Sequence, residues 1–206
     1  MGILFPDCNE NEVKAHSAIS VSHPSARGNK TVTFDYMMDN YPRFQGVNNR
    51  DYWTSKARVK CYPILGVDAS KLHKMCLRVA FAKPYNYTAF RINPLCGGVL
   101  PFDTWFSNTS IIGPSTCVAL TMRVVAASLS RDDTPLTNDA AAFASLGIQQ
   151  EGFCATRVLT GYTPDAAVGA LLSAGALGES VGGFTEATNS ASYDTDLPRP
   201  ILLLRI

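Results

Sequence analysis

Two short stretches of alternating side chains constrain the fold of this chain most strongly. Ala57–Tyr62 alternates the apolar Val59 and Cys61 with charged residues, and Met75–Phe81 repeats the pattern. A period of two is that of a β-strand with one buried face. A sheet with one apolar face needs a second layer to cover it. The two stretches therefore predict an all-β fold in which sheets pack against each other.

Further segments with the same character extend this prediction along the chain. The longest of them, Cys117–Ala127, follows a strong turn at Gly113–Pro114. Pro and Gly between such runs are typical of loops that join strands. The additional predicted strands are Thr31–Tyr36, Thr88–Ile92, Cys117–Ala127 and Phe153–Leu159.

Two segments instead favour short helices. Asn138 is a good N-cap for a helix over Asp139–Leu146, which is rich in alanine. Thr163 followed by Pro and Asp is typical of a helix start, and this helix is expected to end near Leu177, with Gly178 as its stop.

The composition indicates one globular domain without strong charge. The chain has 206 residues, of which 46% are hydrophobic and 17% charged, and its net charge is +1. A chain so balanced is not expected to bind nucleic acid strongly, because such binders carry a basic stripe or arm. Six cysteines occur without a Cys-x-x-Cys pair, and no secretion signal is expected, so we predict reduced thiols in a cytosolic setting. The longest uncharged run, Ala166–Gly178, is too short and too rich in Gly and Ser to span a bilayer.

The C-terminal tail is unusually apolar. Five of the six residues in Ile201–Ile206 are aliphatic. Such a tail has to dock on a protein surface, because exposed apolar patches promote aggregation. Pro198 and Pro200 favour an extended entry, so the tail is expected to dock as a strand or in a groove, either within this chain or on a neighbour.

One motif suggests an enzyme. Cys96–Gly98 resembles the nucleophile turn of the chymotrypsin-like cysteine proteases of picorna-like viruses. A cysteine nucleophile needs a histidine base, and His16, His23 and His73 all precede Cys96. Those proteases place the cysteine late in the chain and have a further histidine after it. Here Cys96 lies in the middle of the chain and no histidine follows it, so a protease is only a remote alternative.

No metal or cofactor site is predicted. His73 and Cys76 form a single His-x-x-Cys pair, which does not complete a four-ligand zinc site. Asp132 and Asp133 lack the glycine and terminal glutamate of a calcium loop. We therefore expect a protein that is not an enzyme and has no catalytic, cofactor-binding or metal-binding residues.

Read in order, several motifs resemble the small coat protein of plant picorna-like viruses of the comovirus and secovirus group. The motifs are a strand start, a tryptophan that leads into a basic alternating strand, and an aromatic loop before a long alternating run. The residues that carry them are Val32–Asp35, Trp53–Lys56, Phe102, Trp105, Asn108–Ser110 and Cys117–Ala127.

The resemblance implies an eight-stranded antiparallel jelly roll. It divides the chain into an N-terminal arm at 1–30, a jelly-roll domain at 31–162, and a C-terminal extension at 163–206 with a short helix and the apolar tail. It also implies a capsid protein that assembles with copies of itself and with related coat domains into an icosahedral shell. Encapsidated RNA is a possible partner, though not through a basic arm, and no membrane is expected. The protein would then reside in the virion, and in the host cytoplasm during assembly.

Under this interpretation the functional residues are those that contact other subunits. The expected interface residues are apolar and lie near the two ends of the chain and in the aromatic loop: Ile3, Leu4, Phe5, Phe102, Trp105, Phe106, Ile201, Leu202, Leu203, Leu204 and Ile206. The alternative is a β-sandwich binding module, lectin-like or accessory, with recognition in the loops Asp39–Tyr52 and Ser128–Asn138.

Overall fold

A computed structural model describes the greater part of the chain. The described residues are 16–25, 28–36, 42–45, 59–82, 85–87, 90–93, 98–101, 113–130, 132–149, 159, 162–181 and 199–205.

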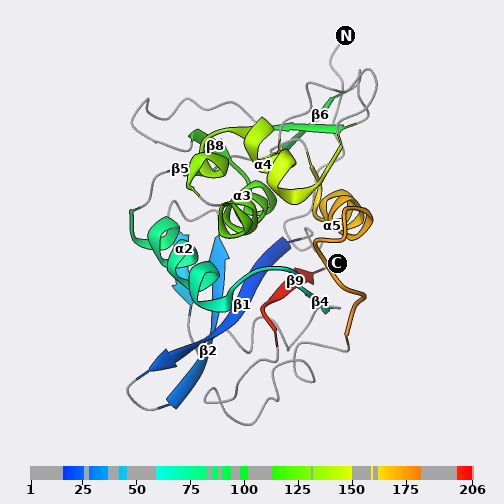
Figure 1. Ribbon diagram of the computed structural model, residues 1–206. Helices are drawn as coiled ribbons and strands as arrows, with labels where there is room; N and C mark the ends of the chain where they lie inside the picture. The colour runs from blue at the N-terminus through cyan, green and yellow to red at the C-terminus, as the bar shows by residue number, and fades with distance from the viewer. Residues whose placement is uncertain are drawn as a thin grey trace.

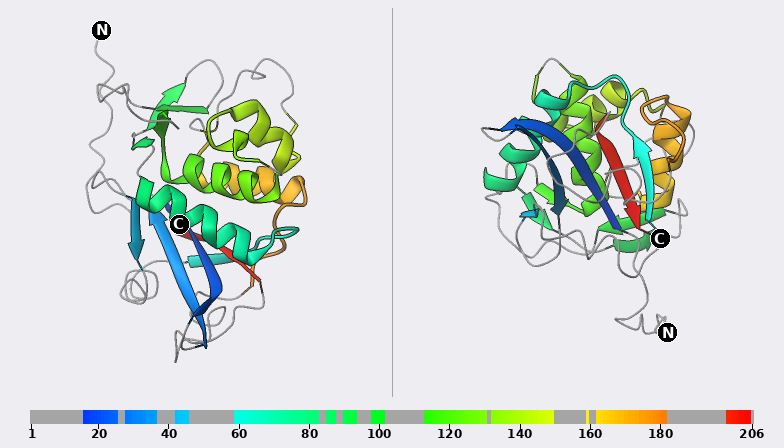
Figure 2. Two further views of the ribbon diagram at one scale, coloured as in Figure 1. Left: turned by 60° about the vertical axis from the view of Figure 1, so that its left-hand side comes forward. Right: turned by 90° about the horizontal axis from the view of Figure 1, so that it is seen from below.

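A five-stranded antiparallel sheet forms the base of the fold. Its strands are β1 (His16–Ser25), β2 (Gly28–Tyr36), β3 (Pro42–Gln45), β4 (Val59–Pro63) and β9 (Ile201–Arg205). Their order is β3-β2-β1-β9-β4, so the last strand of the chain lies between the first and the fourth. Figure 2 shows β9 in red between β1 in blue and β4 in cyan.

Helices form the second layer, on one face of this sheet (Figures 1 and 2). They are α2 (Ala69–Ala82), α3 (Cys117–Leu129), the 3₁₀ turn η2 (Thr134–Leu136), α4 (Asp139–Leu146) and α5 (Pro164–Ser173). The helices α2 and α3 contact the sheet, and α4 and η2 pack on α3. Four short strands form two small ladders: β5 (Tyr85–Tyr87) pairs in parallel with β8 (Gly113–Ser115), and β6 (Phe90–Asn93) pairs in antiparallel with β7 (Gly98–Pro101).

This architecture contradicts the predicted all-β fold. The eight-stranded jelly-roll sandwich is wrong, because helices rather than a second sheet cover the apolar face of the five-stranded sheet. Of the predicted strands, Thr31–Tyr36 lies within β2, Ala57–Tyr62 overlaps β4, and Thr88–Ile92 overlaps β6. Only Leu159 of the predicted strand Phe153–Leu159 is among the described residues.

The predicted strand Met75–Phe81 is part of helix α2. Among the α2 side chains whose burial the structure describes, Leu72, Met75, Cys76 and Val79 are buried, and they follow the helical spacing of three and four residues. Met75 and Val79 fit both periods, because residues four apart share a face of a strand and of a helix alike. Asp68 begins the helix, since its Oδ1 accepts a hydrogen bond of 2.7 Å from the backbone N–H of Lys71.

The predicted strand Cys117–Ala127 is helix α3. All residues from Cys117 to Ser128 are buried, so the helix has no polar face to reveal its period. Its length is 13 residues, and a buried strand is usually four to eight residues long. The hydroxyls of Thr121 and Ser128 donate to the carbonyls of Cys117 and Val124, both at 2.8 Å, and so satisfy themselves inside the helix.

The N-terminal region contains a strand where an irregular arm was expected. In β1, Ile19 and Val21 belong to the core beneath the helices, and Ala18 and Ser20 face the other way. The hydroxyls of Ser20 and Thr33, which are direct partners on β1 and β2, lie 2.5 Å apart. This cross-strand pair stabilises the hairpin on the side away from the helices.

The apolar tail docks within its own chain, as one of the two expected arrangements. Strand β9 runs antiparallel to both neighbours, with Leu203 opposite Ala18 on β1 and opposite Cys61 on β4. Leu202 and Leu204 join the core beneath the helices, whereas Ile201 and Leu203 join a smaller cluster on the opposite face. The four residues Ile201–Leu204 thus place buried apolar side chains on both faces of the sheet.

The outer edge of β4 is sealed by the segment that follows α5. The backbone of Ala176, Gly178 and Val181 bonds to Leu65, Pro63 and Cys61 at 2.9, 2.9 and 2.8 Å. A free strand edge invites pairing with another chain, and covering it is a common protection. This contact also ties α5 to the sheet.

The two predicted helices are confirmed at their starts. The side chain of Asn138 accepts from the backbone N–H of Ala141 at 3.1 Å, and the side chain of Thr163 accepts from that of Ala166 at 3.3 Å. The second helix ends at Ser173 rather than near Leu177, because Gly175 adopts a left-handed conformation with a φ of 71°.

Replacement by alanine should have opposite effects on stability at two glycines of these helices. Gly147 ends α4 with a φ of 69°, so Gly147→Ala is expected to lower the free energy of unfolding by about 1–2 kcal/mol. Gly169 lies inside α5 and has nothing within 4 Å of an added Cβ, so Gly169→Ala is expected to raise it by about 0.5–1 kcal/mol. Urea unfolding measures both. Equal effects of the two changes would contradict the assigned helix ends.

Candidate functional site

A buried arginine gives the helical layer its main polar centre. Arg123 lies in the middle of α3, and its side chain is 6% exposed. Long charged side chains are almost never this buried unless they are paired. The partners of Arg123 therefore define the candidate site.

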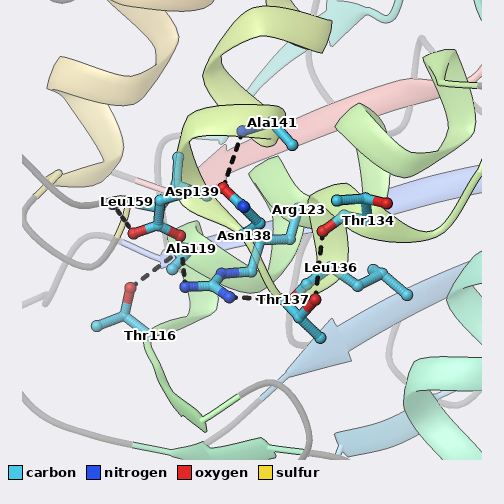
Figure 3. A network of polar contacts seen from close by, with 10 residues as sticks. All are labelled: Thr116, Ala119, Arg123, Thr134, Leu136, Thr137, Asn138, Asp139, Ala141 and Leu159. Atoms are coloured by element: carbon cyan, nitrogen blue, oxygen red, sulfur yellow. Dashed lines mark hydrogen bonds and ion pairs between the residues drawn. The ribbon is translucent and has the colours of Figure 1, made fainter.

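Three elements meet at the Arg123 guanidinium (Figure 3). One terminal nitrogen lies 2.6 Å from Oδ1 of Asp139, the first residue of α4. The other donates to the backbone carbonyl of Leu136 in η2 at 2.9 Å. The second carboxylate oxygen of Asp139 accepts from the backbone N–H of Leu159 at 3.1 Å.

Local sequence explains how Asp139 is positioned. Asn138 caps α4, so the carboxylate of Asp139 lies in the first helical turn, where the helix dipole favours a negative charge. At the other end of the network, Thr116 caps α3 by accepting from the backbone N–H of Ala119 at 3.1 Å. Figure 3 shows both caps flanking the ion pair.

Burial and charge act on Arg123 in opposite directions. Removal from water lowers the pKa of the guanidinium from its usual value, and the nearby charge of Asp139 raises it. A guanidinium is not deprotonated in proteins, so the side chain stays charged at neutral pH.

The arrangement suits a structural role better than a catalytic one. An arginine does not exchange protons in the neutral range, and the Asp139 oxygens already hold Arg123 and the Leu159 backbone. Such a network fixes the relative positions of α3, η2 and α4.

Sequence reasoning did not single out Arg123 and Asp139. A signal was present, since Arg123 is the only charged residue in the long apolar run Cys117–Ala127. A lone charge inside a run that is buried all round requires a buried partner. Its partner lies beyond the polar loop, so the alternating pattern assumed for a strand could not identify it.

The predicted tail residues are buried in the sheet. Ile201, Leu202, Leu203 and Leu204 are between 0% and 4% exposed, with Cys61 beside them on β4. Their side chains therefore contribute to this chain's core. The other predicted interface residues, Ile3, Leu4, Phe5, Phe102, Trp105, Phe106 and Ile206, lie outside the described residues. The subunit interface stays a prediction.

The protease alternative depends on Cys96, whose place the structure does not describe. His73 lies on α2, where its ring meets Phe34 of β2 edge-on with centroids 5.6 Å apart. The ranges that the structure describes contain no group of three or more residues able to hold a metal ion. Cys61, Cys76 and Cys117 are buried thiols.

The structure describes the two loops of the binding-module alternative in part. Pro42–Gln45, inside the first loop, forms strand β3. The second loop is tied to α2, because Lys71 donates to the carbonyl of Ser130 and Arg78 pairs with Asp133. Asp132 accepts from the backbone N–H of Thr134 at 2.9 Å, and this bond lowers the pKa of the carboxyl.

No family model, curated protein or solved structure matches this chain. Among the described residues, no helix combines the length and the apolar character that crossing a membrane requires.

Proposed function

We propose that this chain is a non-enzymatic structural subunit that assembles with further copies of itself. The narrower form of the proposal is a coat subunit in the shell of a plant picorna-like virus. The structure contradicts the jelly roll. This narrower proposal therefore has no support from a fold shared with other coat domains.

The observation that carries the proposal is the buried ion pair of Arg123 and Asp139. The most buried charge of the described residues contacts Asp139 and the Leu136 carbonyl, and its side chain is 6% exposed. A catalytic acid or base instead has to reach the proton that it transfers on the substrate. The polar chemistry inside this layer is thus used to hold helices together.

Composition supports partners that are proteins. With 17% charged residues and a net charge of +1, the chain suits broad, weakly charged contacts better than binding to a polyanion. Subunits of permanent assemblies bury large apolar areas against each other.

Light scattering coupled to size exclusion tests the proposal. We expect a mass above that of the 22.2 kDa monomer that rises with protein concentration, and closed shells by electron microscopy if the chain is a coat subunit. A monomer at every concentration and salt would refute self-assembly. A monomer that is retained on a glycan array would instead support the binding-module alternative.

A further inference from the structure

We propose that copies of this chain assemble by exchanging strand β9, so that the tail of one copy fills the gap between β1 and β4 of another. This inference rests on the proposed self-assembly and names its partner, a second copy of the chain. Three features support it: the place of β9 in the sheet, its chain connection, and its side chains.

The place of β9 leaves a gap that only a strand can fill. It pairs with His16–Ser20 of β1 on one side and with Val59–Pro63 of β4 on the other. The strands β1 and β4 are not neighbours in the sheet order. Without β9, both would present unpaired backbone groups along facing edges, which is the arrangement that accepts a strand from another chain.

The chain connection permits the exchange. Residues 182–198 join Val181 to the segment that leads into β9. A stretch of that length spans up to about 60 Å when fully extended. Exchange of an identical element between copies keeps every contact that the element makes, so it changes the free energy mainly through the link and the protein concentration.

The side chains of Ile201–Leu204 fit a position in the sheet where both faces are covered by apolar residues. Leu202 and Leu204 face the helices, and Ile201 and Leu203 face the other side. The backbone N–H of Ile64 also donates to the carbonyl of Pro200 at 2.7 Å, which fixes where the strand enters. A copy of the same segment reproduces all of these contacts in the same register.

A disulfide can report which chain supplies β9. Leu203 is the direct partner of Cys61 in the antiparallel pair β4–β9, so Leu203→Cys places two thiols opposite each other. After mild oxidation, non-reducing electrophoresis separates a cross-link within one chain from a covalent dimer. Peptide mass mapping then confirms that the bond joins positions 61 and 203. The matched control, Leu203→Cys with Cys61→Ala, removes the native partner and should lose this dimer.

We expect the covalent dimer to predominate in the assembled fraction, and its share to rise with the concentration at which the chain is refolded. A cross-link found only within single chains at every concentration, in a protein that still assembles, would overturn strand exchange and leave self-assembly standing. A protein that never assembles would overturn both.

A second pair of engineered cysteines allows the same test if the Leu203→Cys variant does not fold. Val59 is the direct partner of Arg205 at the end of the same strand pair, and Val59 is only partly buried. The variant with Val59→Cys and Arg205→Cys, in a chain that carries Cys61→Ala, is scored by the same criterion. Its dimer should follow the same dependence on concentration.

Discussion

Replacing Arg123 with methionine is expected to lower the free energy of unfolding by about 3–5 kcal/mol. Methionine keeps much of the side-chain length but leaves the Asp139 carboxylate without its charged partner, 2.6 Å away in the native protein. Asp139→Asn should have an effect of the same kind, because it leaves the guanidinium buried without a counter-charge. Urea unfolding followed by circular dichroism measures each change.

The double variant Arg123→Met with Asp139→Asn separates the pair from its surroundings. Removing both charges together should recover most of the loss, since a buried ion pair replaced by neutral groups is often close to neutral in stability. The side-chain amide introduced at position 139 can still accept from the Leu159 backbone through its carbonyl oxygen. If the two single losses simply added, the pair would not be coupled, and the central role assigned to the network would fall.

A surface pair provides the matched control. Arg78 and Asp133 also form an ion pair between helix α2 and the loop before η2, but their side chains are 60% and 46% exposed. Water screens such a pair, so Arg78→Met is expected to change stability by less than about 1 kcal/mol. Comparable losses at Arg78 and Arg123 would show that burial is not what makes the second pair important.

Replacing Leu203 with aspartate is expected to abolish the folded state. Leu203 is 0% exposed at the centre of the sheet, so the change removes an apolar side chain and buries a carboxylate without a counter-charge. The first effect is worth about 2–5 kcal/mol and the second several more, which together approach the whole stability of a typical domain, about 5–15 kcal/mol. The expected result is the loss of a cooperative thermal transition.

Two controls show whether this effect comes from the buried position. Leu203→Met conserves volume and should lower stability by less than about 1.5 kcal/mol. Leu172→Asp changes an exposed leucine of α5, 37% accessible, and should stay within about 0.5 kcal/mol of the native protein. A soluble Leu203→Asp protein with an unchanged melting transition would contradict the central place of β9.

Local signals in the sequence predicted local structure correctly. The helix starts at Asn138 and Thr163 depend on a side chain that bonds a backbone N–H three residues away, so the information lies within one turn. Strand β2 was recognisable for a similar reason, because Val32 and Phe34 alternate with threonines. The sequence also predicted that the apolar tail docks on a protein surface, without identifying that surface.

The tertiary structure decided what the sequence left ambiguous. For α2 and α3, the alternating pattern was misleading, because Met75 and Val79 suit either period and Cys117–Ser128 is buried on all sides. For α3, burial on every side removes the polar face that would have shown its helical period. Contacts between distant parts of the chain also determine the features related to function. Arg123 pairs with Asp139 across a loop, and β9 pairs with β1 and β4, which are far from it in sequence. The sequence determined that the charge needed a partner and that the tail needed a cover, and only long-range packing chose which residues supply them.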